Sequence, residues 1–260
     1  AIMRSIIMAR RRFFVDAVEG ASAMLAGEDA RHLRQVLRAT PGQLYELSDN
    51  RSVYLAEIET VSREGIRFRV VEELEQQPPP VRITLLLALV KFDRFEWALE
   101  KATELGVERI VPVECERSEK GLRMAAAKRL ERWRRIVRES SQQARRARLP
   151  EVLPPVGFCE ATSGTASFSC FLDEQGGAGP LLCVLPAGRQ PSDIVRVLIG
   201  PEGGGTETER SRACAAGWTA ASLGPNILRT ETAAVAALAL LTGAWLESAS
   251  VDSLLSRPLS

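Results

Sequence analysis

Two segments rich in glycine and proline are the best candidates for a ligand-binding site. Residues 197–209 (VLIGPEGGGTETE) run from an apolar stretch through a glycine-rich turn into the start of a helix. Residues 222–232 (SLGPNILRTET) repeat that order. Glycine lets the backbone approach a ligand closely, and open α/β sheets bind ligands beyond the carboxyl ends of their strands. The two loops therefore predict an adenosine-sized, mainly uncharged site, unless both are simple strand-to-helix connections.

The spacing in these loops excludes two common nucleotide-binding motifs. No lysine follows the glycines as it does in the GxxxxGK[ST] phosphate loop, and the GxGxxG spacing of a dinucleotide turn is missing. Thr206 and Glu209 have the spacing of a capping box, which predicts that a helix begins there. We expect backbone groups to form most of the site.

The cysteines form no recognisable framework for a metal or for disulfides. The chain has five, an odd number, and they are widely spaced and never arranged as CxxC. We therefore expect no metal cofactor and a reducing, cytoplasmic location.

Positive charge is concentrated in one segment of a nearly neutral chain. The sequence has 34 Lys and Arg against 33 Asp and Glu, but between Lys120 and Arg148 there are eleven cations against two anions, a local excess of nine. Such an excess predicts contact with the phosphates of a nucleic acid, because neutralising phosphates dominates nucleic-acid affinity. The alternative is a solvated helix face.

Three prolines divide the chain into two predicted domains. Pro78, Pro79 and Pro80 fix φ and remove backbone donors, so we place a linker there. Before the linker, alternating apolar residues and turn signals predict a helix over 29–38 and strands over 12–15, 44–47, 53–58 and 66–71. Residues 10–76 are expected to form a small, mostly β domain.

After the linker, predicted strands alternate with predicted helices. The strands are 82–90, 109–113, 168–172, 181–185 and 195–199, and the helices are 94–105, 124–148, 206–216 and 230–246. Gly106 should close the first of these helices in a left-handed conformation. This alternation predicts an α/β domain over residues 81–248.

The longest apolar stretch, residues 233–246, predicts a buried helix. At about fourteen residues it is too short to cross a bilayer. Because it has few charges to turn toward water on any face, we also expect it to form a homodimer contact. The basic opening residues lack the apolar core and cleavage site of a secretion signal.

Five motifs, in family order, resemble one group of enzymes. They are GPEGGGTETE, SLGPNILRTETAAVAAL, KFDRFEWALEKATELGVERIVPVECERS, RRIVRESSQQARRARLPEV, and the N-terminal RRFFV with RHLRQVLRATPG. Over about residues 10–246 the chain resembles the RsmE-type family of 16S rRNA uridine-N3 methyltransferases within the SPOUT superfamily. The family usually has another small or an aromatic residue where this chain has Gly205, which implies a more flexible loop here.

The resemblance implies a fold, a cofactor and partners. The expected fold is a C-terminal SPOUT α/β domain with a trefoil knot, plus a small N-terminal PUA-like β-barrel domain that binds RNA. The expected cofactor is S-adenosylmethionine, held near a homodimer interface, and the expected substrate is 16S ribosomal RNA of the small ribosomal subunit. The residues implied to line the cofactor pocket are Leu172, Ile199, Gly200, Pro201, Glu202, Gly203, Leu223, Gly224, Ile227 and Leu228.

Methylation of a uridine nitrogen requires that the nitrogen lose its proton, so the enzyme must stabilise an anion. Arg229 is the candidate for that stabilisation, and Glu202 or Glu231 for accepting the proton, because all three lie in or beside the two loops. The alternatives are helix capping and ion pairing for Arg229 and Glu231, and loop capping for Glu202.

Eight residues are candidates for RNA contact. Lys91 and Arg94 follow a predicted buried strand at its carboxyl end, and Gln143 with Arg146 matches the family's QxxR element. His32, the only histidine, lies on the predicted N-terminal helix, where a structural role is the alternative. The remaining candidates, in the same domain as His32, are Arg10, Arg12 and Arg38.

Three rival functions remain open. A SPOUT enzyme acting on ribose 2'-oxygen or on tRNA would give a different modified nucleoside. A non-catalytic ribosome-assembly protein that binds RNA would have no need of two intact ligand loops. A kinase or NTPase is disfavoured by the missing phosphate-loop lysine.

Overall fold

The protein, seen in a computed structural model, is described here over residues 11–174 and 177–255. These residues group into two compact units. The first unit runs to Gln77 and also takes in Arg138–Leu149, and the second holds Pro78–Val137 and the chain from Pro150 onward. Residues 138–149 therefore pack with the N-terminal unit, although their position in the sequence groups them with the later α/β elements.

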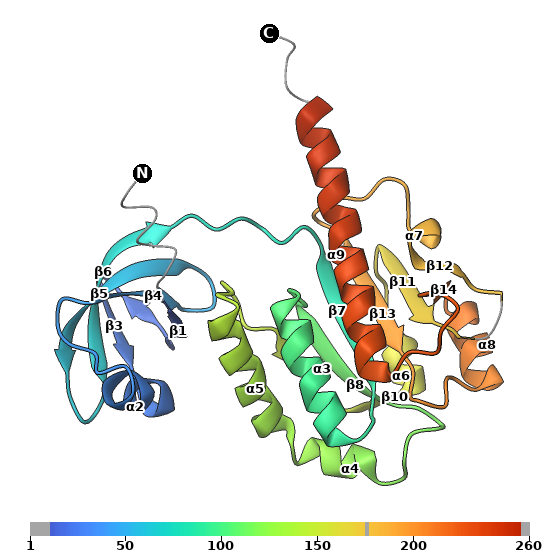
Figure 1. The fold of residues 1–260 in the computed structure, drawn as a ribbon, viewed down its shortest axis with the longest axis horizontal. Coiled ribbons are helices and arrows are strands. Elements are labelled where there is room, and N and C mark those ends of the chain that lie inside the picture. Colours follow the sequence, from blue (N-terminus) through green and yellow to red (C-terminus); the bar gives the residue numbers. More distant parts are fainter. Residues whose placement is uncertain (1–10, 175–176, 256–260) are drawn as a thin grey trace. The chain divides into compact units, whose positions relative to one another are not determined.

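The first unit contains a six-stranded sheet (Figure 1). Its strand order is β1-β4-β5-β6-β3-β2, and only the pair β1 and β4 is parallel. The elements are β1 Arg12–Phe14, β2 Val18–Glu19, β3 Ser22–Leu25, α2 Gly27–Gln35, β4 Leu44–Ser48, β5 Val53–Val61 and β6 Ile66–Leu74. The four strands and the helix predicted from the sequence are confirmed, whereas the short β2 and β3 were not predicted.

Alternating strand residues and one face of α2 form the core of this unit. Leu33 of α2 is fully buried and packs with Leu47, Ile58 and Phe68 of the sheet. Leu33 belongs to the apolar face that the helical spacing predicted.

The second unit is built on an eight-stranded, all-parallel sheet. The order is β10-β8-β7-β13-β11-β14-β12, with β9 paired to β8. The strands are β7 Arg82–Ala88, β8 Arg109–Glu114, β9 Glu151–Val152, β10 Val156–Gly157, β11 Phe168–Leu172, β12 Gly179–Pro180, β13 Ile194–Ile199 and β14 Thr219–Ser222. The helices are α3 Phe92–Glu104, α4 Leu122–Ala127, α5 Leu130–Gln143, α6 Phe158–Thr162, α7 Leu181–Val184, α8 Glu207–Ala215 and α9 Thr230–Leu255, and α5 belongs to the first unit from Arg138 onward.

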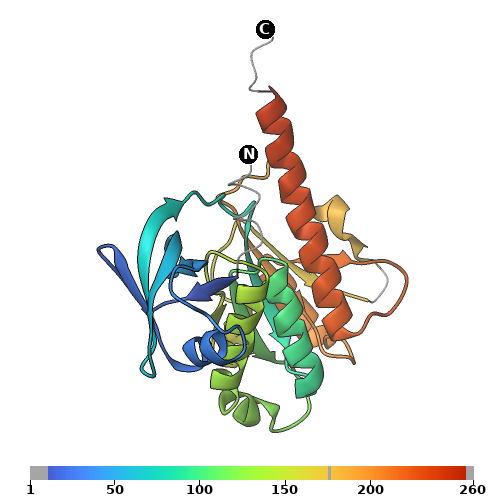
Figure 2. The same cartoon turned by 60° about the vertical axis from the view of Figure 1, so that its left-hand side comes forward.

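Helices cover both faces of this sheet. Leu85 and Leu87 of β7 pack in one core with residues of α3 and α9, which lie side by side in Figures 1 and 2. The neighbouring Leu86 and Ala88 pack on the opposite face with residues of α6 and α8. Burial on both faces explains why β7 is continuously apolar.

Two predicted elements differ from the structure. The strand predicted at 181–185 is the short helix α7, in which Leu181 is buried but Leu182 is 53% exposed. An apolar run this short has too few residues for its periodicity to distinguish a strand from a buried helix. The single helix predicted at 124–148 is divided into α4 and α5, and it ends before Arg145, which has a φ of 53° and so leaves the helical conformation.

Gly106 closes α3 with a φ of 90°, as predicted. Helix α9 begins at the predicted residue and continues to Leu255. Within the described residues, no helix has both the length and the apolar character needed to cross a membrane.

Candidate functional site

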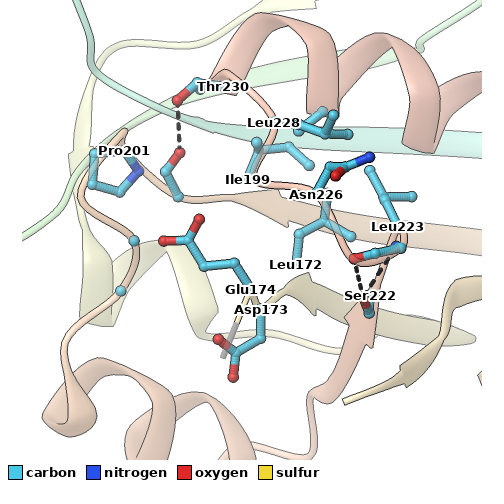
Figure 3. Close-up of a pocket in the computed structure, with 15 residues that line it drawn as sticks. Leu172, Asp173, Glu174, Ile199, Pro201, Ser222, Leu223, Asn226, Leu228 and Thr230 are labelled. Carbon is cyan, nitrogen blue, oxygen red and sulfur yellow. Dashed lines mark hydrogen bonds between the residues drawn. The ribbon is translucent and has the colours of Figure 1, made fainter. Parts of the chain in front are cut away.

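A pocket of about 560 Å³, counting its open mouth, lies where three strands of the second unit end (Figure 3). It is lined by residues that follow β11, β13 and β14, and by the first turn of α9. Strand β11 pairs in parallel with both β13 and β14, so the carboxyl ends of the three strands meet at one edge of the sheet. The lining residues are Leu172, Asp173, Glu174, Ile199, Gly200, Pro201, Gly204, Gly205, Ser222, Leu223, Gly224, Asn226, Leu228, Thr230 and Ala233.

The three consecutive glycines of the first loop are in different environments. Gly204 has a φ of 68°, and a Cβ atom added to it would lie 2.6 Å from Oε1 of Glu174. A Cβ on Gly203 would lie 3.4 Å from Cδ of Arg117, whereas one on Gly205 would meet no atom closer than 3.9 Å. The structure therefore requires glycine most strongly at Gly204. The positive φ is found at Gly204 and not at Gly203.

Three arginines from other parts of the chain contact this glycine-rich loop. Arg94 of α3 forms an ion pair with Glu202, and Arg117 donates a hydrogen bond to the carbonyl of Gly203. Arg210 of α8 donates to the carbonyl of Gly205 at 2.7 Å. Such contacts limit the freedom of a loop that its glycines alone would leave flexible.

The predicted capping box is confirmed. The backbone N–H of Glu209 donates to Oγ1 of Thr206 at 3.2 Å, and the N–H of Thr206 donates to Oε2 of Glu209 at 2.9 Å. Glu209 is only 1% exposed, and its other oxygen accepts a hydrogen bond from the N–H of Glu116 at 2.8 Å. This carboxylate has a structural role at the start of α8.

The second loop is joined to the first by one hydrogen bond. The hydroxyl of Thr230, the first residue of α9, donates to the carbonyl of Gly200 at 3.1 Å (Figure 3). Thr230 is 3% exposed, and Gly224 in the same loop has a φ of 126°. The two loops that the sequence singled out thus lie against each other and share one pocket.

The thiols behind the pocket are not nucleophiles. Burial raises the pKa of the Cys170 thiol in β11 to about 12, and burial raises the pKa of Cys115 as well. Both remain protonated near neutral pH and therefore pack as small apolar groups.

Most residues predicted to bind the cofactor lie around this pocket, but three do not line it. Glu202 and Gly203 belong to the loop but lie outside the lining, and Ile227 is 77% exposed. The lining residues among the predictions are Leu172, Ile199, Gly200, Pro201, Leu223, Gly224 and Leu228.

The three candidate catalytic residues do not line the pocket either. Arg229 is exposed beside it, between Leu228 and Thr230. Glu202 is paired with Arg94, and its side chain is 52% exposed. Glu231, in the first turn of α9, has a buried Oε2 with no hydrogen-bond partner among the described residues. Their catalytic roles remain predictions.

Asp173 and Glu174 are pocket residues that the sequence patterns did not identify. They come directly after β11, and this position is the signal that was missed, since β11 is a third strand ending at the same edge. The family resemblance implied Leu172, the last residue of β11, but no local pattern extended the pocket to the two residues that follow it.

The RNA-contact candidates of the first unit differ in exposure. Arg12 is 6% exposed, so it is not the exposed cation that we expected. Its Nε and Nη2 donate to Oε2 of Glu46 at 3.0 and 2.8 Å. His32 and Arg38 are exposed, and Nε2 of His32 lies 3.4 Å from Nη1 of Arg11. Arg10 lies outside the described residues.

Part of the arginine-rich segment is used to attach residues 138–149 to the first unit. Arg138 donates to Oδ2 of Asp29 at 3.0 Å, and Arg145 pairs with Glu46. Gln143 is exposed, while Arg146 is half-buried and donates to the carbonyl of Arg148 at 3.2 Å.

Other arginines of the segment also have acidic partners within the second unit. Arg129 and Arg132 both pair with Glu96, and Arg123 lies 3.4 Å from Glu114. The excess of nine positive charges counted along the sequence is therefore smaller in the folded chain. Of the two candidates near the start of α3, Lys91 is exposed immediately before the helix, whereas Arg94 is paired with Glu202.

A family model and several relatives of known name are all similar to this chain, and all of them are described as RNA methyltransferases. The model of a family described as an RNA methyltransferase domain matches residues 77–242. A ribosomal RNA small subunit methyltransferase E from Mycobacterium tuberculosis is 33% identical, over 92% of this chain and 94% of that protein. The Bacillus subtilis protein of the same name is 28% identical, over 89% and 96%.

Two solved structures have a similar fold. A ribosomal RNA small subunit methyltransferase E from Neisseria gonorrhoeae, bound to S-adenosylmethionine, matches with a TM-score of 0.80 and 33% identity, over 91% of this chain and 98% of that chain. A methyltransferase from Legionella pneumophila, also with S-adenosylmethionine, matches with a TM-score of 0.81 and 29% identity, over 90% and 98%.

Proposed function

The chain belongs to the ribosomal RNA small subunit methyltransferase E family, and we propose that it transfers the methyl group of S-adenosylmethionine to N3 of a uridine in 16S ribosomal RNA. The observation that carries this proposal is the pocket at the ends of β11, β13 and β14, which two glycine loops enclose. Similar folds have been solved with S-adenosylmethionine bound.

The residues present fit this cofactor. The lining offers apolar side chains from Leu172, Ile199 and Leu228 for an adenine ring, and backbone groups of the glycine loops for its polar edge. Two carboxylates, Asp173 and Glu174, suit a ligand that carries positive charge.

In the proposed reaction the N3 proton of uridine is lost and the nitrogen attacks the methyl carbon, while the carbon–sulfur bond breaks. The cofactor supplies the electrophilic methyl group. Arg229 would stabilise the uridine anion, since it is exposed at the edge of the pocket. Glu231 is the better candidate for accepting the proton, because its Oε2 lacks a partner whereas Glu202 is held by Arg94.

RNA recognition is the proposed role of the first unit and of exposed cations in the second. Residues 10–76 would form the PUA-like domain, with Arg138–Leu149 packed onto it, and residues 81–248 would form the SPOUT domain with its trefoil knot. His32, Arg38, Lys91, Gln143 and Arg146 are proposed to contact the RNA. Such a reaction places the protein in the cytoplasm with the small ribosomal subunit.

A homodimer is proposed through α9. This helix buries Leu238 and Leu241 against its own sheet, but Leu240 and Leu246 are 37% and 51% exposed. Exposed apolar side chains on a helix with few charges favour contact with a second copy of the chain. Sedimentation of the purified chain at micromolar concentration tests this, and a monomer would contradict it.

The modified nucleoside tests the proposed reaction. The protein, S-adenosylmethionine and unmethylated small subunits are incubated, and the digested RNA is analysed by mass spectrometry. N3-methyluridine is the expected product. A 2'-O-methylated nucleoside or a methylated tRNA would support the rival enzymes, and RNA binding without methylation would support an assembly protein.

A further inference from the structure

The charged side chains that line the pocket are all acidic. Among the described residues, Asp173 and Glu174 are the ionisable members of the lining. Both come directly after β11, which lies between β13 and β14. A ligand in the pocket therefore meets a negative potential from the wall that these two residues form.

The two carboxylates are not equivalent. Oδ1 of Asp173 lies 3.9 Å from Nη1 of Arg210, so a nearby cation offsets its charge. The carboxylate of Glu174 points toward the glycine-rich loop in Figure 3, while that of Asp173 points away from it. The contact that a Cβ on Gly204 would make, at 2.6 Å from Oε1 of Glu174, places this carboxylate against the loop. Since no cation in the described part of the chain pairs with Glu174, its charge is not offset.

Substrate and product of a methyl transfer from S-adenosylmethionine differ in charge at the sulfur. The substrate has a sulfonium cation, and the product, S-adenosylhomocysteine, has a neutral thioether. Both keep the same ammonium and carboxylate groups. A fixed negative charge in the pocket therefore stabilises the substrate more than the product, and Coulomb attraction acts over several ångströms without direct contact.

We propose that Glu174 makes the pocket select S-adenosylmethionine over S-adenosylhomocysteine through the charge at sulfur, an inference that rests on the proposed cofactor. The same carboxylate that favours binding of the substrate then favours release of the product, because the attraction is lost when the methyl group leaves. Glu174 acts here as a specificity-determining residue and takes no part in the proton transfer.

Calorimetry on the full chain with three ligands tests this proposal. Sinefungin is the third ligand, because it has an amine in place of the S-methyl group and so carries a positive charge without a sulfonium. Glu174→Gln should weaken S-adenosylmethionine and sinefungin by roughly three- to tenfold, the effect of one charge pair several ångströms apart in a partly solvated pocket. S-adenosylhomocysteine should bind Glu174→Gln nearly as it binds the wild type, which also shows that the variant is folded.

Two further variants serve as comparisons. Asp173→Asn should change the ratio of the two affinities less, because its carboxylate points away from the loop. Glu207→Gln is the matched control. Glu207 pairs with Arg210, the arginine that also lies near Asp173, but its side chain is 81% exposed on α8 and lies outside the pocket lining. It should leave all three affinities unchanged.

Equal loss of all three ligands in Glu174→Gln would overturn the proposal, because the carboxylate would then recognise the ammonium group that the ligands share. Unchanged affinity for all three would overturn it as well. If the wild-type protein binds none of the three, the proposed cofactor itself is wrong, and this inference falls with it.

Discussion

The pocket of the second unit and residues 138–149 of the first unit, where the arginine-rich segment ends, differ in how their charges are paired. In the first unit, Arg145 of the segment and Arg12 of β1 both pair with Glu46, whose side chain is 1% exposed. At the pocket, Glu174 has no cationic partner in the described chain. In the first turn of α9, outside the lining, Oε2 of Glu231 is buried without a hydrogen-bond partner among the described residues.

Charged side chains in this molecule therefore have two different roles. A buried charge with a partner stabilises the fold only modestly, but removing the partner leaves an uncompensated ion. A charge without a partner is available to a ligand. Of the two regions, the arginine-rich segment has the stronger charge signal in the sequence, yet much of its charge is used inside the protein.

The largest expected effect is at Glu46. Glu46→Ala leaves Arg12 and Arg145 without their shared carboxylate, and it should lower the free energy of unfolding by roughly 3–5 kcal/mol, as removal of one partner of a buried pair does. Urea denaturation followed by circular dichroism measures this. Glu57→Ala is the control, because Glu57 pairs with Arg69 at the surface and should cost at most about 1 kcal/mol. Equal effects of the two substitutions would contradict the comparison.

The next largest effect is expected at Arg229. If this exposed arginine stabilises the uridine anion, Arg229→Ala should lower kcat about a hundredfold while cofactor affinity stays nearly unchanged. Arg229→Lys keeps the charge but loses the planar fork, so it should restore activity only in part. Because the base must lose a proton, kcat of the wild type should rise with pH. A loss of cofactor affinity equal to the loss of rate would instead assign Arg229 a role in binding.

A smaller effect should separate the glycines of the first loop. Gly204→Ala places a side chain at a positive φ and against Glu174, so the free loop should relax into another conformation. If restoring the conformation that the pocket needs costs about 1–2 kcal/mol, as for a left-handed residue, S-adenosylmethionine binding should weaken by roughly tenfold. Gly205→Ala meets no close atom and should bind the cofactor almost as the wild type does. Calorimetry on both variants checks this. If Gly205→Ala is the weaker binder, the loop changes shape when the cofactor binds.

Contacts between residues close in the sequence could be predicted in these regions, and contacts between residues far apart in the sequence could not. The capping box of Thr206 and Glu209 depends on residues three apart, so its signal is local and was identified. The pairing of Arg145 with Glu46 joins residues that are 99 positions apart, and no local sequence pattern indicates it. Glu174 was missed for the same reason, since its place in the pocket depends on β11 lying between β13 and β14.

The smallest expected effect concerns exposed cations that would meet RNA. Arg38 is exposed, and Arg69 in the same unit pairs with Glu57. If Arg38 neutralises one phosphate, Arg38→Gln should make the slope of log affinity against log salt shallower by about 0.7 for single-stranded RNA or about 0.9 for a duplex. Arg69→Gln should leave the slope unchanged, because its partner already neutralises it. Arg146→Gln tests the segment in the same way, with RNA affinity measured at several salt concentrations. If Arg38→Gln and Arg146→Gln both leave affinity and slope unchanged, the RNA docks on another surface. The exposed charges of the first unit then face water and contact no phosphate.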